Sequence, residues 1–461
     1  MAEHEDELTE RDEDEYSLDT QVVAAILDAV EAGDSAAIDL LMEPLHAADI
    51  ADLFEQIGAS ARAGLIGLWS RGIDGEILSE LDESIREEVI DLLPHDVLRE
   101  AVRELDSDDV VDLLEDLEQP QQVRILDALA DSDRAAVEQS LTYPEKSAGR
   151  LMQREIVMAP EHWTVGNAID YMRGNKKELP EQFYHVILVD PRMKPVGYVT
   201  LGKILSTKRS VPMTEICEDT FRTINVLEEE GDVAYAFNQY HLISAPVVDS
   251  DDRLVGVITI DDAMAVLDEE HEEDIMRLAG VGDGSLSDSV IETTKQRLPW
   301  LAVNLVTAIL ASIVIAQFEG VIVQIVALAV LMPIVASMGG NAGTQALTVA
   351  VRAIATRDLT GSNVWRVVRR EAMVGLVNGL IFAAVMGVVG WVWFGSVQIG
   401  AILAAAMVVN LVVAGLAGIL IPVTLEKAGV DPALASGAFV TTVTDVVGFF
   451  AFLGLAAMVL L

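Results

Sequence analysis

Residues 431–461 read DPALASGAFVTTVTDVVGFFAFLGLAAMVLL, and this stretch decides the fold of the C-terminal part of the chain. After Asp431, its only charged side chain is Asp445. About 20 apolar residues span the hydrocarbon core of a bilayer, so the stretch predicts a transmembrane helix. A carboxylate at that depth is costly unless a cation or a partner meets it, which makes Asp445 the first candidate functional residue.

Three further apolar runs precede this stretch, at residues 298–318, 320–351 and 372–425. The last of them is long enough for two helices with a turn near residues 394–400, so we predict five spans. Basic residues gather at 295–297, 352–370 and 427, whereas the connections 317–320 and 393–400 contain no Lys or Arg. We predict a multi-pass protein of a prokaryotic plasma membrane. The positive-inside rule predicts that its N-terminus is cytoplasmic and its C-terminus outside.

Charge is distributed very unevenly along the 461 residues, which contain 74 acidic and 30 basic side chains. Residues 295–461 hold six acids and eight bases, so 68 acids and 22 bases, a net charge of −46, precede them. Such a field opposes compaction and attracts counter-ions. Divalent cations or simple hydration would both relieve it, and we expect no nucleic-acid partner.

The N-terminal residues 1–17 are strongly acidic and have neither a basic region nor an apolar core. They predict a disordered acidic tail rather than a signal peptide. Cys217 is the one cysteine of the sequence and excludes an intramolecular disulfide, which fits a cytosolic location of the acidic half.

The run 320–351 differs from an ordinary span because it contains Pro333 and the segment SMGGNAGTQ, residues 337–345. Two interpretations stay open. The small residues could form a tight helix crossing. Alternatively, irregular backbone could line a pore, with Asn341 and freed carbonyls facing a hydrated ion.

Residues 18–143 have helical apolar spacing and contain a repeat. The segment LHAADIADLF, residues 45–54, matches LDSDDVVDLL, residues 105–114. This periodicity predicts stacked helical hairpins that form a superhelix. Asp108 and Asp112 are one turn apart on it and would share a face, which is either a solvated surface or a cation site.

A second duplication lies between residues 144 and 268. LVD (188–190) and GYVT (197–200) recur as VVD (247–249) and GVIT (256–259). The pattern GVITIDDA, residues 256–263, resembles the closing strand and helix of a CBS domain, so residues 144–208 and 209–268 resemble a CBS pair. The resemblance implies that Thr259 and Asp262 hold a nucleotide ribose, whereas Lys203 in the first unit argues against a second site. The pair could instead bind no nucleotide and serve as a dimerising plate.

The order of these parts resembles the MgtE family of magnesium channels and transporters. The motifs that carry the resemblance are MPIVASMGGNAGTQ (332–345), IATRDL (354–359), VDPALAS (430–436) and TTVTDVVG (441–448). The resemblance implies a multidomain fold: an α-helical superhelical N-domain, an α/β CBS-domain pair, a connecting plug helix at 269–296, and an all-α membrane domain of five helices at 297–461. It also implies a homodimer.

The resemblance further implies a set of functional residues. Asp445 and Asn341 would be pore residues, with Thr441 and Ser337 beside them. Ser337 and Gly437 depart from the pattern of the family. Acidic ligands of regulatory Mg²⁺ are implied at Glu76, Asp108, Asp112, Asp262, Glu270, Glu273, Asp274 and Asp431.

We therefore predict a homodimeric magnesium-selective channel or transporter for Mg²⁺ uptake, closed by cytosolic Mg²⁺ and with ATP as a second candidate ligand. An alternative is a membrane-anchored nucleotide sensor that conducts no ion, and another is a channel for other divalent cations such as Co²⁺. An intramembrane aspartyl protease would need two membrane aspartates, and His-Glu-x-x-His is absent from the sequence, so we predict no enzyme.

Overall fold

The computed structural model describes residues 18–460, apart from 116, 177–178, 181, 219–220 and 282–289. The predicted acidic tail, residues 1–17, lies outside the described residues. The chain divides into two compact units, Met1–Glu270 and His271–Leu461.

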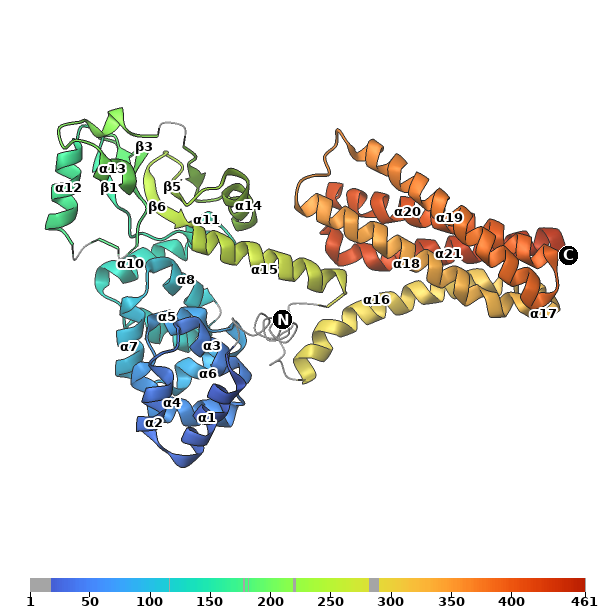
Figure 1. Ribbon diagram of the computed structural model, residues 1–461, viewed down its shortest axis with the longest axis horizontal. Helices are drawn as coiled ribbons and strands as arrows, with labels where there is room; N and C mark the ends of the chain where they lie inside the picture. Colours follow the sequence, from blue (N-terminus) through green and yellow to red (C-terminus); the bar gives the residue numbers. More distant parts are fainter. Residues whose placement is uncertain are drawn as a thin grey trace, which may run out of the picture. The chain divides into compact units, whose positions relative to one another are not determined.

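The first unit begins with short helices that pack into one domain (Figure 1). Their bounds are α1 Thr20–Ala32, α2 Ser35–Met42, α3 Ala47–Gln56, α4 Ala59–Trp69, η1 Ser70–Gly72, α5 Gly75–Glu80, α6 Glu83–Leu92, α7 His95–Glu104, α8 Ser107–Glu115, α9 Gln119–Leu126 and α10 Asp131–Ser140.

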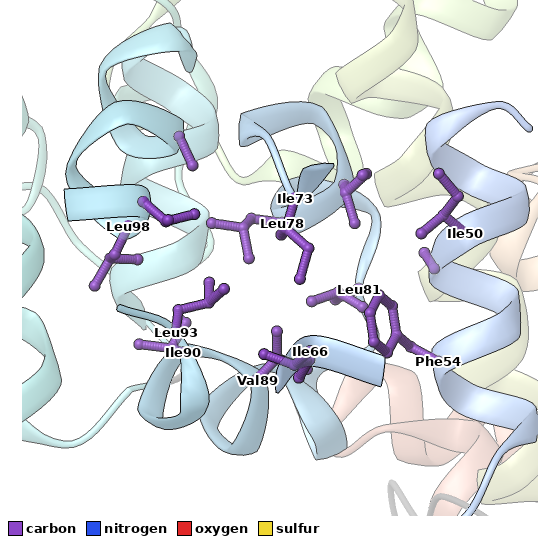
Figure 2. Packing of buried hydrophobic residues seen from close by; sticks show 14 of the residues in the cluster. Ile50, Phe54, Ile66, Ile73, Leu78, Leu81, Val89, Ile90, Leu93 and Leu98 are labelled. Atoms are coloured by element: carbon purple, nitrogen blue, oxygen red, sulfur yellow. The ribbon is translucent and has the colours of Figure 1, made fainter. Parts of the chain in front are cut away.

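The repeat of the sequence corresponds to α3 and α8, which begin two residues into their matching segments. Each helix buries one apolar face, and these faces meet in a continuous core (Figure 2). Phe54, Leu78 and Leu98 are almost completely buried in it. Burying a side chain of this size contributes about 1.5–3 kcal/mol, so the core stabilises helices that are too short to be stable alone.

The rest of the first unit consists of two similar α/β subdomains. The sheet of the first subdomain consists of β1 (Met158–Pro160), β2 (His185–Val189) and β3 (Pro195–Thr200). Its helices are α12 (Val165–Gly174) and α13 (Leu201–Ser206). The sheet of the second subdomain consists of β4 (Ile224–Asn225), β5 (Ser244–Val248) and β6 (Leu254–Thr259). Its helices are α14 (Glu230–Tyr240) and α15 (Ile260–Leu278). The short helices α11 (Ala148–Leu151) and η2 (Met213–Glu215) lie in the connections.

The two sheets have the same pairing. The first strand is parallel to the second, the second is antiparallel to the third, and a register shift falls at Leu188/Val189 in one sheet and at Val247/Val248 in the other. The predicted duplication of an α/β unit is therefore confirmed.

The helix α15 runs without interruption from the second subdomain into the acidic connector. It contains no Gly or Pro between Ile260 and Leu278, and the left-handed Gly280, with φ +69°, follows its end. The connector expected as one helix over 269–296 is thus described as the second half of α15 and the start of α16, while residues 282–289 lie outside the description.

The second unit contains long apolar helices with a short helix between two of them (Figure 1). They are α16 Val290–Ala316, α17 Glu319–Gln324, α18 Ala327–Ala355, α19 Val364–Phe394, α20 Val397–Lys427 and α21 Pro432–Leu460. Five of them are long and apolar enough to cross a membrane, which confirms the predicted spans. The turn between α19 and α20 lies at residues 395–396, as expected.

Small residues allow α19 and α20 to approach closely. A Cβ added at Gly375 would lie 2.5 Å from the carbonyl oxygen of Leu411, and one at Gly379 would lie 3.0 Å from Cα of Val408. Further along the pair, a Cβ at Gly390 would lie 3.2 Å from Cα of Gly400. These backbone contacts follow the small-residue packing that is typical of membrane helices.

The expectation of irregular backbone at Pro333 and residues 337–345 is wrong, whereas the lining of a pore by Asn341 stays a prediction. The helix α18 continues through Pro333 and through the glycine-rich segment. Within it, Gly343 packs against Val440 and Thr444 of α21, and Gly418 of α20 packs against Ala346. Gly339 and Gly343 therefore serve a tight helix crossing, which was the other interpretation, whereas a Cβ added at Gly340 would meet no atom within 4 Å.

Candidate functional site

The first candidate site is a polar stripe on α18. Ser337, Asn341, Thr344 and Thr348 recur every three or four residues, so they share one helix face, and all four are exposed in the single chain. The opposite face is buried, with Val335, Gly339, Gly343 and Ala350 among its members. The hydroxyls of Thr344 and Thr348 donate to Gly340 O and Thr344 O, 2.9 and 3.0 Å away, respectively.

Asp445 lies on α21, which packs against α18 through its Val440 and Thr444. Thr444 is fully buried, whereas Asp445 and Thr441 are half-buried at the edge of this contact. No Lys or Arg of the described residues forms an ion pair with Asp445. The Thr441 hydroxyl lies 3.0 Å from Gly437 O and 3.1 Å from Ala438 O. The fold thus joins the two helices that carry the predicted pore residues, without a hydrogen bond between Asn341 and Asp445.

Sequence reasoning missed Asn410, which is completely buried in α20. Its amide nitrogen donates to Val335 O at 2.7 Å, and its Oδ1 has no hydrogen-bond partner in the described structure. Gly339 of α18 and Gly448 of α21 both pack directly against this amide. Asn410 therefore holds three helices together, and a polar residue inside the apolar run 401–425 was the signal that could have found it.

A groove with three polar side chains in a mostly apolar lining, also missed, lies on α18 beside the stripe. It has a volume of about 170 Å³ and lies between α18, α19 and α20. Gln345, Glu371 and Asn378 supply its polar groups, and Gly375 and Gly415 are among its small apolar residues. The carboxylate and the two amides could bind a polar or cationic group.

The second candidate site lies where α8 meets α15. Asp108 is buried, and burial together with the Asp262 carboxylate raises its pKa well above the usual range. Burial first, then Asp262 and Asp106, raise the pKa of Asp109 to about 7. Burial also raises the pKa of Asp262 to about 6, although Thr259 hydroxyl donates to it at 2.6 Å. The structure thus brings the predicted ligands Asp108 and Asp262 together, with Asp109, which was not predicted.

The other predicted regulatory ligands have different surroundings. Asp112 pairs with Arg86 at 3.1 Å, and Glu76 is exposed in the first turn of α5. Glu270 lies against Gly231 at the start of α14. Nearby, burial raises the pKa of Glu230 to about 7, although Lys146 opposes the shift.

In the second unit, Arg277 occupies the space between two predicted ligands. Its guanidinium pairs with Asp431 at 3.0 Å and with Glu273 one helical turn away. Asp274 is half-buried on the same helix. Among the described residues, no three His, Cys, Asp or Glu side chains are grouped so that they could hold a metal ion.

A small cavity in the CBS-like region is lined by Thr259 together with Tyr184, His185 and Ser244. His185 Nδ1 and Ser244 Oγ are 2.5 Å apart, and burial lowers the pKa of His185. At the corresponding position of the first subdomain, Lys203 forms an ion pair with Glu218. The two halves of the pair therefore offer unequal surroundings to a ligand.

Comparisons with known proteins agree with this division of the chain. Family models described as "Divalent cation transporter", "MgtE intracellular N domain" and "CBS domain" match residues 332–455, 45–146, and 148–209 with 225–269, respectively. The magnesium transporter MgtE of Thermus thermophilus is 30% identical over 96% of this chain and 99% of its own length. The MgtE of Enterococcus faecalis is 33% identical over 70% of this chain and 71% of its own.

A solved structure described as the cytosolic domain of the Mg²⁺ channel MgtE in complex with ATP covers 53% of this chain and 99% of its own, at 28% identity and a TM-score of 0.49. The predicted resemblance is confirmed by the family models and by a relative that is similar over nearly the whole length. The chain belongs to the MgtE family of magnesium transporters.

Proposed function

We propose that this chain forms a homodimeric, magnesium-selective pathway for Mg²⁺ uptake, closed by cytosolic Mg²⁺. The observation that carries the proposal is Asp445, a half-buried carboxylate of a membrane span with no basic partner among the described residues. Such a group needs a counter-charge, and a transported cation supplies one.

The exposed stripe on α18 supports the dimer. Ser337, Asn341, Thr344 and Thr348 would face lipid in a single chain, where the Asn341 amide could not be solvated. A second copy would cover this face and enclose a hydrated path between the two subunits. Two Asp445 carboxylates, one from each subunit, would then lie along that path.

The chemistry of Mg²⁺ fits such a path. The ion prefers octahedral oxygen coordination and releases its water reluctantly. Asp445 would therefore attract the hydrated ion electrostatically, while the Asn341 amide and the Thr441 hydroxyl would bond to its water. The two Asp445 carboxylates would repel each other while the path is empty, and an entering ion would relieve this repulsion.

Closure by cytosolic Mg²⁺ is supported by the acidic cluster between α8 and α15. Burial and mutual repulsion raise the pKa values of Asp108, Asp109 and Asp262, so their charged forms are costly in this arrangement. A hydrated Mg²⁺ held by Asp108 and Asp262 would lower this cost and stabilise the arrangement of α8 and α15. The carboxylates of Glu230 and Glu270, and those of Glu273 and Asp431 beside Arg277, would add further Mg²⁺ sites.

ATP is proposed as a second ligand, in the cavity lined by Thr259. The hydrogen bond from Thr259 to Asp262 keeps side by side the two residues that the CBS pattern assigns to a ribose. The ion pair of Lys203 with Glu218 supports a single site in the pair.

The test is Mg²⁺ flux into liposomes that contain the purified full-length protein. Asp445→Asn should reduce the flux by at least about tenfold, equivalent to about 1.4 kcal/mol, whereas Glu426→Gln, at an exposed acid near the end of α20, should leave it unchanged. Undiminished flux in the Asp445 variant would overturn the pore assignment.

The same liposomes test the alternatives. A membrane-anchored nucleotide sensor would show no flux of any divalent ion. A pathway with another selectivity would conduct Co²⁺ as well as Mg²⁺. Protease accessibility of the soluble unit on either side of the vesicle would test the proposed cytoplasmic N-terminus and the external C-terminus.

A further inference from the structure

The end of α18, the start of α19 and the connection between them carry an unusual concentration of basic side chains. Of the eight Lys and Arg residues between 295 and 461, five lie within residues 352–370. We name Arg366, Arg369 and Arg370, at the start of α19, the arginine belt. All three are exposed, as is Arg352 at the end of α18.

The arginine belt continues into an apolar surface. At helical spacing after it come Met373, Val377 and Leu380, which are 58%, 50% and 56% exposed. The opposite side of α19 is buried against α20 and includes Val368, Gly375 and Gly379. A face that is apolar and exposed along a membrane span contacts lipid, so the belt lies where this lipid-facing surface ends.

The belt is also held in place. Leu359, Val364 and Val368 are buried together with Ile419 and Val423 of α20, which fixes the connection to the helix bundle. Within the connection, the Asn363 amide donates to Asp358 O at 2.7 Å, and Thr360 N–H donates to Asn363 Oδ1 at 2.9 Å. The guanidinium groups are therefore presented from a packed scaffold.

Trp365 stands at the first turn of the same helix and is 67% exposed. Exposed indoles are favoured at the level of lipid headgroups, where the ring is partly apolar and its N–H remains hydrated. The exposed arginines would face the phosphate of a phospholipid, Trp365 the headgroup region, and the apolar surface of α19 the acyl chains.

We infer that the arginine belt is a binding site for the phosphate of an anionic phospholipid headgroup. Guanidinium groups bind phosphate in bidentate fashion, and basic clusters beside membrane helices attract anionic lipids. The positive-inside rule would also explain these arginines, but it requires only their charge. A fixed basic surface beside a lipid-facing stripe is suited in addition to binding one kind of ligand. Each arginine near such a surface contributes about fivefold in affinity, so three contribute on the order of a hundredfold.

The experiment measures the binding of phosphatidylglycerol and phosphatidylcholine to the full-length protein in detergent, by native mass spectrometry and by the shift in melting temperature. The wild-type chain should bind phosphatidylglycerol preferentially. The variant R366Q/R369Q/R370Q should lose this preference by on the order of a hundredfold, while R366K/R369K/R370K should retain part of it.

The matched control is R71Q/R99Q/R192Q, which removes three exposed arginines of the first unit and should bind the lipid as the wild type does. An unchanged melting temperature in phosphatidylcholine shows that each variant is folded. Equal binding of both lipids by the wild type, or undiminished preference in the glutamine variant, would overturn the inference.

Two other occupants are distinguished by the same experiment. If inorganic phosphate at equal concentration raises the melting temperature as much as phosphatidylglycerol does, the belt binds free phosphate and the lipid assignment is wrong. If the glutamine variant keeps its lipid preference but its acidic first unit becomes more sensitive to protease, the belt binds the chain's own carboxylates instead.

Discussion

Replacing Asp109 by Asn should stabilise the contact between α8 and α15 at neutral and alkaline pH when Mg²⁺ is absent. Burial and neighbouring carboxylates raise the pKa of Asp109 from 3.8 to about 7. The folded state therefore binds its proton more tightly than the unfolded state does. The contribution of this group to the free energy of unfolding is therefore largest at low pH and is lost as the pH rises from about 4 to about 7.

The magnitude follows from the size of this shift. About three pKa units correspond to about 4 kcal/mol as an upper bound. The asparagine also loses the favourable interaction of a carboxylate with the N-terminus of α8, which is about 0.3–1 kcal/mol. The difference sets an upper bound of about 3–3.7 kcal/mol on the net stabilisation at pH 8.

The assay is hydrogen exchange of α8 in the full-length protein, measured with EDTA from pH 5 to pH 8 and corrected for intrinsic exchange rates. In the wild type, protection should fall as the pH rises, and millimolar Mg²⁺ should restore it. Asp109→Asn should flatten this dependence, whereas the control Asp96→Asn, at an exposed acid in the first turn of α7, should not. Equal or weaker protection of α8 in the Asp109 variant at pH 8 would refute the reasoning.

Three further substitutions test the packing and the ion pairs of the second unit. Gly375→Ala should destabilise the protein by about 1–3 kcal/mol because its Cβ would press on Leu411 O, whereas Gly361→Ala, in open space, should not; melting temperatures in detergent compare them. Gly448→Ala should be destabilising in the wild type but tolerated with Asn410→Ala, since its Cβ would lie 2.8 Å from the Asn410 amide; additive effects in this double-mutant cycle would contradict the contact. Arg277→Gln should make the melting temperature more dependent on Mg²⁺, because Glu273 and Asp431 lose their shared cation; an unchanged Mg²⁺ response would argue against a metal site there.

Periodicity and length were sufficient to predict much of the fold. The apolar runs predicted five spans, and the recurrence of LVD and GYVT predicted two similar sheets, because local pattern determines both features. The glycine-rich part of α18 was harder to interpret. Glycine permits irregular backbone and close packing alike, and only the structure shows that Gly339, Gly340 and Gly343 remain helical.

The site could be predicted only in part. Asp445 stands out because a charge in an apolar run is visible in the sequence, and Asp108 and Asp262 were suggested by the family resemblance. The pairing of Arg277 with Asp431 joins residues 154 positions apart, so no local pattern contains it. Asn410 is visible in the sequence as a polar residue in an apolar run, but its contacts with Gly339 and Gly448 appear only in the structure.

The seam between α19 and α20 has a mechanical consequence. Where backbone meets backbone at Gly375, Gly379 and Gly390, there are no side chains whose rotamers could adjust to a sliding movement. The two helices should then move as one rigid body throughout a transport cycle. Any opening of the pathway would have to come from elements joined by ordinary side chains, such as α16, and cross-linking α19 to α20 should leave the flux intact.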